Sequence, residues 1–266
     1  MIIVAGGDSF IFGSELSDKI PSLRDKNWSR RTFTSLLAGM SKMHYECVAW
    51  PGNANQAITR QTMEYCESHK DIDKFVIISW TFPNRYEFRF PFTTPNKNTN
   101  WESISSWSIA DFSDIEQSLE STPAEEIKRI ETYKQKLDKS GVADFAKTYF
   151  KYVGTNEYWE IYTSLQSIVM MQNYLDLHKI PYMFTMADNC IFENHTILSR
   201  EQSIEALFRQ INFDNWFMFP GSKGFYQWAM ENKYPIGVTH PLDEAHADAA
   251  QLMKSKLHEL VAKFNK

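Results

Sequence analysis

The sequence predicts an α/β protein, a three-layer α/β/α sandwich around a central parallel sheet of about five strands. Short apolar segments bounded by turn residues alternate along the chain with longer segments of helical periodicity. Strands buried on both faces have near-continuous apolar sequences, and their alternation with helices predicts right-handed crossovers in a parallel sheet. With 266 residues, 43% of them hydrophobic, the chain is long enough to bury the core of one such domain.

The order of the elements follows from these patterns. We expect buried strands at residues 2–5, 44–50, 74–80 and 180–186, with 213–219 as a candidate fifth strand. We expect helices at 28–40, 55–68, 157–178 and 242–264, where apolar residues recur at helical spacing. This is a flavodoxin-like order of elements, and we treat residues 1–266 as a single domain.

One segment, residues 92–150, is too long for a loop between a strand and a helix. Its first part is polar, and its second part, from residue 123, is charged and helical in pattern. We predict a mainly helical inserted subdomain after the third strand. It would either overhang the carboxyl edge of the sheet or pack there without a role in function.

Composition excludes several classes of function. The net charge is −5 with no long Lys/Arg block, so we expect no nucleic-acid partner. The three cysteines show no metal-ligand or disulfide spacing, and we expect no metal and no cofactor. No apolar stretch reaches the roughly 20 residues of a membrane span, and no signal-peptide pattern is seen, so we expect a cytoplasmic protein without a membrane partner. Composition leaves the oligomeric state open.

The first strand ends in Gly7-Asp8-Ser9. In open α/β sheets the reacting groups gather at the carboxyl ends of the strands. Ser9 is therefore a candidate nucleophile, with a following helix whose N–H groups face a developing negative charge. Taken alone, the same residues also fit a helix N-cap.

Polar residues also follow the second and third predicted strands. Gly52 lies in a turn where a backbone N–H is free of side-chain obstruction. After the third strand, Thr81 and Asn84 are candidate donors to an oxyanion. Arg85 either meets an acidic group of the substrate or forms a structural ion pair with a carboxylate such as Glu87.

A histidine, His240, precedes Pro241 and the last predicted helix. A proline in the first helical turn fixes the direction of the chain, so the imidazole of His240 can be aimed across a cleft as a general base. Asp243 and His246 are three residues apart on one helical face and form an alternative local pair.

Together these pieces resemble the SGNH (GDSL-like) hydrolases, and most closely the divergent members found in bacteriophages and marine bacteria. Gly7-Asp8-Ser9, Gly52 and His240-Pro241 match three of that family's four blocks. The resemblance implies that Ser9 and His240 are catalytic and that Gly52, with Thr81 or Asn84, holds the oxyanion. We place Asp8 and Arg85 in the same substrate site.

The sequence departs from the family pattern in two places. The third block lacks its Gly-x-Asn-Asp form, so the oxyanion donor is either Thr81 or Asn84. The position three before His240 is Gly237 where the family has an aspartate. Either another carboxylate, such as Asp243 or Asp188, completes a catalytic triad, or Ser9 and His240 work as a dyad.

The resemblance implies a serine esterase that acts on O-acyl esters, above all O-acetyl groups, including those of carbohydrates. An aromatic wall after the third strand would receive the substrate, unless its members are core residues: Trp80, Tyr86, Phe88, Trp101 and Trp107. The missing acid at Gly237 leaves a second hypothesis, an inactive SGNH-like binding or structural module. A nucleotide-binding protein is a third, but the glycines near Ser9 fit neither phosphate-loop fingerprint.

Overall fold

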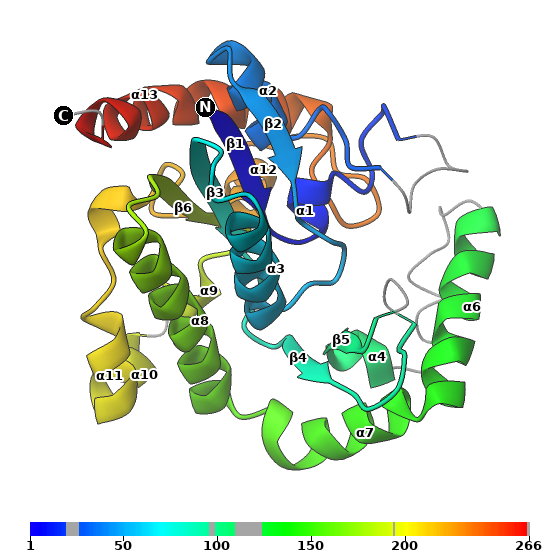
Figure 1. Ribbon diagram of the computed structural model, residues 1–266. Coiled ribbons are helices and arrows are strands. Elements are labelled where there is room, and N and C mark those ends of the chain that lie inside the picture. The colour runs from blue at the N-terminus through cyan, green and yellow to red at the C-terminus, as the bar shows by residue number, and fades with distance from the viewer. Residues whose placement is uncertain (20–26, 96–98, 110–123, 194, 265–266) are drawn as a thin grey trace.

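The computed structural model describes the chain except for residues 20–26, 96–98, 110–123, 194 and 265–266. Its main sheet has four parallel strands in the order β2-β1-β3-β6 (Figure 1). The fold class predicted from the sequence is confirmed. The strands are β1 (Ile2–Gly6), β2 (His44–Cys47), β3 (Lys74–Trp80) and β6 (Tyr182–Met186).

The candidate fifth strand is reduced to one isolated bridge to the main sheet. Trp216 pairs with Phe184 of β6, and the residues before it form a 3-10 turn, Phe213–Asn215. The turn begins there because the Asn212 side chain accepts the N–H of Asp214. Such local capping competes with extended structure.

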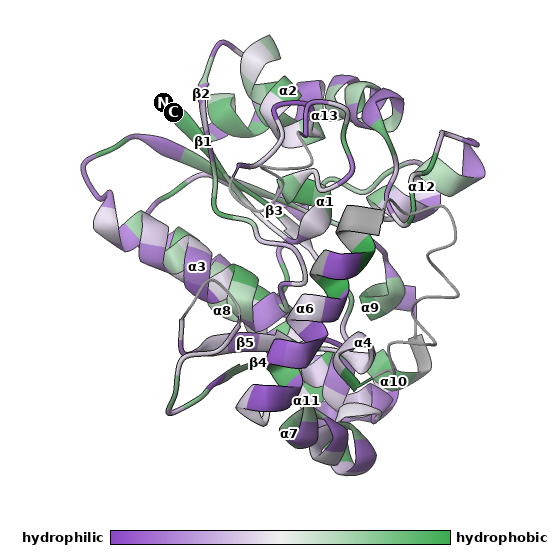
Figure 2. Ribbon diagram, turned by 90° about the vertical axis from the view of Figure 1, so that its right-hand side faces the viewer, coloured by the Kyte–Doolittle hydropathy of each residue, from purple (hydrophilic) through white to green (hydrophobic). Residues whose placement is uncertain are grey.

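Alternate residues of each strand serve opposite faces of the sheet, as strand geometry requires. Ile3, Ala5, Phe75 and Ile77 belong to the core beneath α2 (Phe33–Met40) and α13 (Asp243–Phe264). The intervening strand residues pack under α3 (Asn55–Ser68) and α8 (Glu157–Leu177). Figure 2 shows β1 as almost wholly hydrophobic, whereas α3 carries hydrophilic residues along its length.

The described part of segment 92–150 contains helices and the second strand of a hairpin whose first strand lies before residue 92. The antiparallel strands of this hairpin, β4 (Tyr86–Arg89) and β5 (Trp101–Ile104), were not predicted. The helices are α4 (Ser106–Ile109), α6 (Ala124–Ser140) and α7 (Val142–Tyr149), followed by a π-helical turn, Phe150–Gly154. They share a third core with the hairpin and lie beyond the carboxyl ends of the main strands (Figure 1).

Short helices complete the layers around the carboxyl edge of the main sheet. They are α1 (Ser9–Phe12), α9 (Cys190–Glu193), α10 (His195–Arg200), α11 (Gln202–Phe208) and α12 (Phe225–Glu231). Across the described residues, no helix is long and apolar enough to cross a membrane. The same residues contain no group of three or more His, Cys, Asp or Glu side chains that could hold a metal ion.

His246 is a buried histidine that joins α13 to the start of α2. Its Nδ1 accepts the Phe33 N–H at 3.1 Å, and its ring is 1% exposed. Burial, together with the nearby charge of His240, lowers the pKa of His246 to about 3. The folded state therefore holds the imidazole neutral at pH values where the unfolded chain binds a proton.

This histidine predicts a loss of stability in acid. Between pH 7 and pH 5 the unfolded chain gains a proton at His246 that the folded protein does not, which costs about 2 kcal/mol of unfolding free energy. His246→Asn keeps an acceptor for Phe33 and removes the titration. Urea unfolding at the two pH values should show a drop about 2 kcal/mol smaller in this variant. The exposed His258→Asn is the control, and equal drops in all three proteins would contradict the assignment.

Candidate active site

Ser9 lies at the carboxyl end of β1, as the first residue of α1. The N-cap of that helix is Asp8, whose Oδ1 accepts the Phe10 N–H at 3.0 Å. A Cβ at Gly7 would lie 2.4 Å from Ile11 Cγ1, so the turn needs a glycine there. Because Asp8 performs the capping, the hydroxyl of Ser9 is left for another partner.

That partner is His240. Ser9 Oγ lies 2.7 Å from Nε2 of His240, although the two residues are 231 positions apart. The opposite ring nitrogen, Nδ1, lies 2.6 Å from Oε1 of Glu15. The three side chains form one hydrogen-bonded chain of hydroxyl, imidazole and carboxylate.

Glu15 is held in place from the loop that precedes α13. The Thr239 hydroxyl donates to Glu15 Oε1 at 3.0 Å, and the Thr239 N–H donates to the same carboxylate. Burial alone would raise the pKa of the Glu15 carboxyl, but the hydrogen bond and charge of His240 and the bonds from Thr239 outweigh it and lower that pKa. Glu15 is therefore ionised at neutral pH.

Gly237 makes room for this carboxylate. A Cβ built on Gly237 would lie 2.0 Å from Glu15 Oε2. The space that a side chain at position 237 would occupy is thus filled by the carboxylate of Glu15. The acid missing three residues before His240 is replaced from a different part of the chain.

Neither acid considered from the sequence contacts His240. Asp243 accepts the Ser17 hydroxyl and N–H and pairs with Arg31 at 3.1 Å. Asp188 accepts the Cys190 N–H. The alternative pairing of Asp243 with His246 is also not formed, because the Nδ1 of His246 is bonded to α2.

Asp8 is the centre of a second polar cluster beside Ser9. Its side chain is fully buried, and its Oδ2 accepts the Thr81 hydroxyl at 2.6 Å and Arg85 Nη1 at 2.9 Å. Arg85 thus pairs with Asp8 and not with Glu87. Thr81 points its hydroxyl at Asp8, so this donor is already engaged.

Two backbone N–H groups at this edge have no partner in the part of the chain that the structure describes. Among the described residues, neither the Ser9 N–H nor the Gly52 N–H has a hydrogen-bond partner. Gly52 adopts a positive φ of 80°, which turns the chain after β2 at no steric cost. The next side chain, Asn53, is buried and donates to the Gly7 carbonyl at 2.9 Å, which ties the Gly52 turn to the Ser9 turn.

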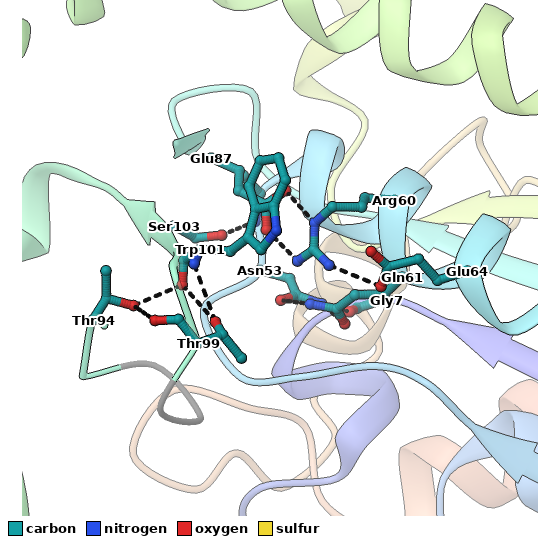
Figure 3. Close-up of polar contacts among 11 residues, drawn as sticks. Gly7, Asn53, Arg60, Gln61, Glu64, Glu87, Thr94, Thr99, Trp101 and Ser103 are labelled. Atoms are coloured by element: carbon teal, nitrogen blue, oxygen red, sulfur yellow. Dashed lines mark hydrogen bonds and ion pairs between the residues drawn. The ribbon is translucent and has the colours of Figure 1, made fainter. Parts of the chain in front are cut away.

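The β4–β5 hairpin supports the same turn from the outside (Figure 3). The Ser103 hydroxyl accepts the Ala54 N–H at 3.1 Å. Arg60 of α3 forms a bidentate pair with Glu87, at 2.6 and 3.0 Å, and lies over the Trp101 ring. This cluster joins the hairpin to α3 and to the loop that carries Gly52.

The predicted aromatic wall is only partly at the surface. Trp80 and Tyr86 are buried in two different cores, and Trp107 is 38% exposed. The aromatic ring in contact with the imidazole is instead Phe10, with its centroid 4.7 Å from that of His240. Phe82 and Tyr226, both partly buried, pack against Phe10 at 6.4 and 6.1 Å.

A hydroxyl, imidazole and carboxylate in series, at the carboxyl edge of an open parallel sheet, are the arrangement that serine hydrolases use. No protein-family model matches this chain, and no curated protein sequence matches it. The structure is similar to a protein described as lipolytic and of the G-D-S-L family from Desulfitobacterium hafniense DCB-2, with 11% identity, a TM-score of 0.43 and coverage of 96% of this chain and 98% of that one.

A second similar structure is the psychrotrophic esterase EstA from Pseudoalteromonas sp., in a form inhibited by monoethylphosphonate. The identity is 9%, the TM-score is 0.42, and the match covers 99% of this chain and 97% of that one. Both TM-scores are below 0.5, so these two likenesses carry no argument about function.

Proposed function

We propose that the protein is a serine hydrolase of small O-acyl esters, with Ser9 as nucleophile, His240 as general base and Glu15 as the residue that orients the base. The observation that carries the proposal is the continuous chain from Ser9 Oγ through His240 to Glu15, at 2.7 and 2.6 Å. A carboxylate at Nδ1 keeps the proton on that nitrogen, so that Nε2 is the one that accepts the serine proton.

The reaction begins when Ser9 Oγ attacks the ester carbonyl and its proton passes to His240 Nε2. The free N–H groups of Ser9 and Gly52 are the donors proposed for the resulting oxyanion. Collapse of this intermediate breaks the bond to the alcohol, which leaves with the proton from His240. Water then hydrolyses the acyl-enzyme, with His240 again as base.

The site favours a small acyl group. Ser9 is only 7% exposed, and the side chains of His240 and Glu15 are 15% and 20% exposed. O-acetyl esters, including acetylated carbohydrates, are the substrates that the family resemblance implies and that fit this narrow access. A protein kept only for binding has no need of a polarised serine–histidine pair, so the presence of Glu15 favours the enzyme over the inactive module.

A fluorophosphonate probe tests the proposal directly, because it reacts only with an activated serine. We expect stoichiometric labelling at Ser9 and turnover of acetyl esters, and loss of both in Ser9→Ala. Ser35→Ala in α2 is the matched control, because that hydroxyl makes no hydrogen bond among the described residues. A folded native protein that neither reacts with the probe nor cleaves any ester would point to the binding module instead.

A further inference from the structure

The proposed oxyanion site holds two backbone donors, and three neutral side chains of the same strand-end turns already donate to other groups. Thr81 donates its hydroxyl to Asp8, and Asn53 donates its amide to Gly7 and Gln61. Asn55 donates its amide to the Thr81 carbonyl and to Ser164. None of these side chains can turn toward an oxyanion without leaving a buried polar group unpaired.

Arg85 is different because most of its donors are unused. Its Nη1 bonds Asp8 Oδ2 at 2.9 Å and lies 3.5 Å from the Asn53 carbonyl. Asp8 directly precedes Ser9, and Asn53 directly follows Gly52, so one guanidinium nitrogen touches both turns that carry the free N–H groups. Its Nε and Nη2 have no hydrogen-bond partner within the described residues.

The guanidinium is also held in place and partly accessible. The side chain is 20% exposed, and its Cζ lies 5.0 Å from the Phe82 ring centroid. Phe82 in turn contacts Phe10, which packs on His240. Arg85 is thus fixed between Asp8 and Phe82, beside the two turns that carry the free N–H groups.

We propose that Arg85 is the side-chain donor of the oxyanion hole. This inference rests on the proposed hydrolase activity. As the Ser9 Oγ–carbon bond forms, the carbonyl π pair moves to the oxygen, and the serine proton passes to His240. The Arg85 N–H donates a charge-assisted hydrogen bond to that oxygen and keeps its own proton throughout, because the guanidinium does not deprotonate in proteins.

Arg85→Met should lower kcat on a neutral acetyl ester by about 10²–10³, with little change in KM, because the lost donor acts on the charge that develops in the transition state. The rate of phosphonylation by a neutral fluorophosphonate should fall in parallel. The matched control is Arg89→Met in β4, an exposed arginine without a hydrogen-bond partner among the described residues, which should change neither rate.

Variants built on Asp8→Asn distinguish hydrogen-bond donation by Arg85 to the oxyanion from neutralisation of the Asp8 charge. Asp8→Asn keeps the cap of α1 and removes the buried charge that Arg85 neutralises. If Arg85 is the oxyanion donor, Asp8→Asn/Arg85→Met is still 10²-fold or more slower than Asp8→Asn alone. If Arg85→Met alone unfolds because it leaves the buried Asp8 charge unpaired, the double variant, which lacks that charge, should still fold.

Three results would overturn the inference while leaving Ser9 labelling intact. Equal kcat values with and without Arg85 in the Asp8→Asn background would make the arginine only a charge partner. A rise in KM confined to anionic esters would make it a clamp for a substrate carboxylate. A loss of kcat in Asn84→Ala, with Arg85→Met unaffected, would move the donor to that exposed asparagine. If Ser9 is never labelled, it is the proposed hydrolase that fails, and not the role of Arg85 alone.

Discussion

Glu15→Gln should lower kcat by roughly 10³–10⁴ while KM changes little, the size of effect seen when the orienting acid of a serine hydrolase is replaced by its amide. The amide is nearly the same shape as the carboxylate, so the loss reports on charge and tautomer rather than on packing. Without the anion at Nδ1, the imidazolium formed during attack loses its stabilising partner. Steady-state kinetics on an acetyl ester measure the loss.

The steric relation between Glu15 and Gly237 allows a sharper version of the experiment. In Glu15→Ala/Gly237→Asp the new carboxylate enters the space that Glu15 Oε2 vacates. We expect at least a tenfold recovery of kcat over Glu15→Ala alone. Gly237→Asp by itself should be damaging, since its Cβ would lie 2.0 Å from an oxygen of Glu15.

The exposed Glu244→Gln is the matched control for the change of Glu15 and should leave kcat unaltered. Asp243→Asn tests whether Asp243, and not Glu15, orients His240. If Asp243→Asn lowers kcat by orders of magnitude and Glu15→Gln does not, then the acid considered from the sequence is the working one. The ion pair of Asp243 with Arg31 would in that case have to break during turnover.

Local signals explain which site residues could be predicted. Ser9, Gly52 and His240 each lie next to a strand end or a helix start, and the sequence around each of them reveals that position. Glu15 has no such mark, because it reaches His240 across 225 positions of sequence. Its only trace in the sequence is the glycine at position 237, which shows that an acid is missing without showing where its replacement lies.

The fold was predictable where burial alone decides the structure. The predicted third strand coincides with β3, all seven residues of which are buried. The segment 213–219 is also apolar, but Phe213 and Trp216 pack with Phe192 in an aromatic cluster, and Asn212 starts a turn. The β4–β5 hairpin escaped prediction because its strands have only four residues each and its anchor to α3 is a long-range ion pair.

That ion pair should dominate the stability of the inserted hairpin. Arg60→Met leaves the Glu87 carboxylate, whose side chain is 2% exposed, without its cation, and we expect a loss of about 3–5 kcal/mol in the free energy of unfolding. Burial raises the pKa of Glu87, although the hydrogen bonds and charge of Arg60 oppose this rise. The carboxylate is therefore largely removed from water and depends on Arg60 for its stabilisation. Urea unfolding at neutral pH measures the change.

The paired variant Arg60→Met/Glu87→Leu should recover most of this loss, because a buried ion pair replaced by apolar groups costs little once neither charge is left alone. Glu64→Gln is the matched control: Glu64 also pairs with Arg60, but its side chain is 61% exposed, so its removal should cost no more than about 1 kcal/mol. A double variant as unstable as Arg60→Met would show that the contact of the guanidinium with Trp101, and not the charge pair, holds the hairpin against α3.

Because Ser103 of the same hairpin bonds the Ala54 N–H, loss of this anchor should also lower kcat by loosening the turn that presents Gly52.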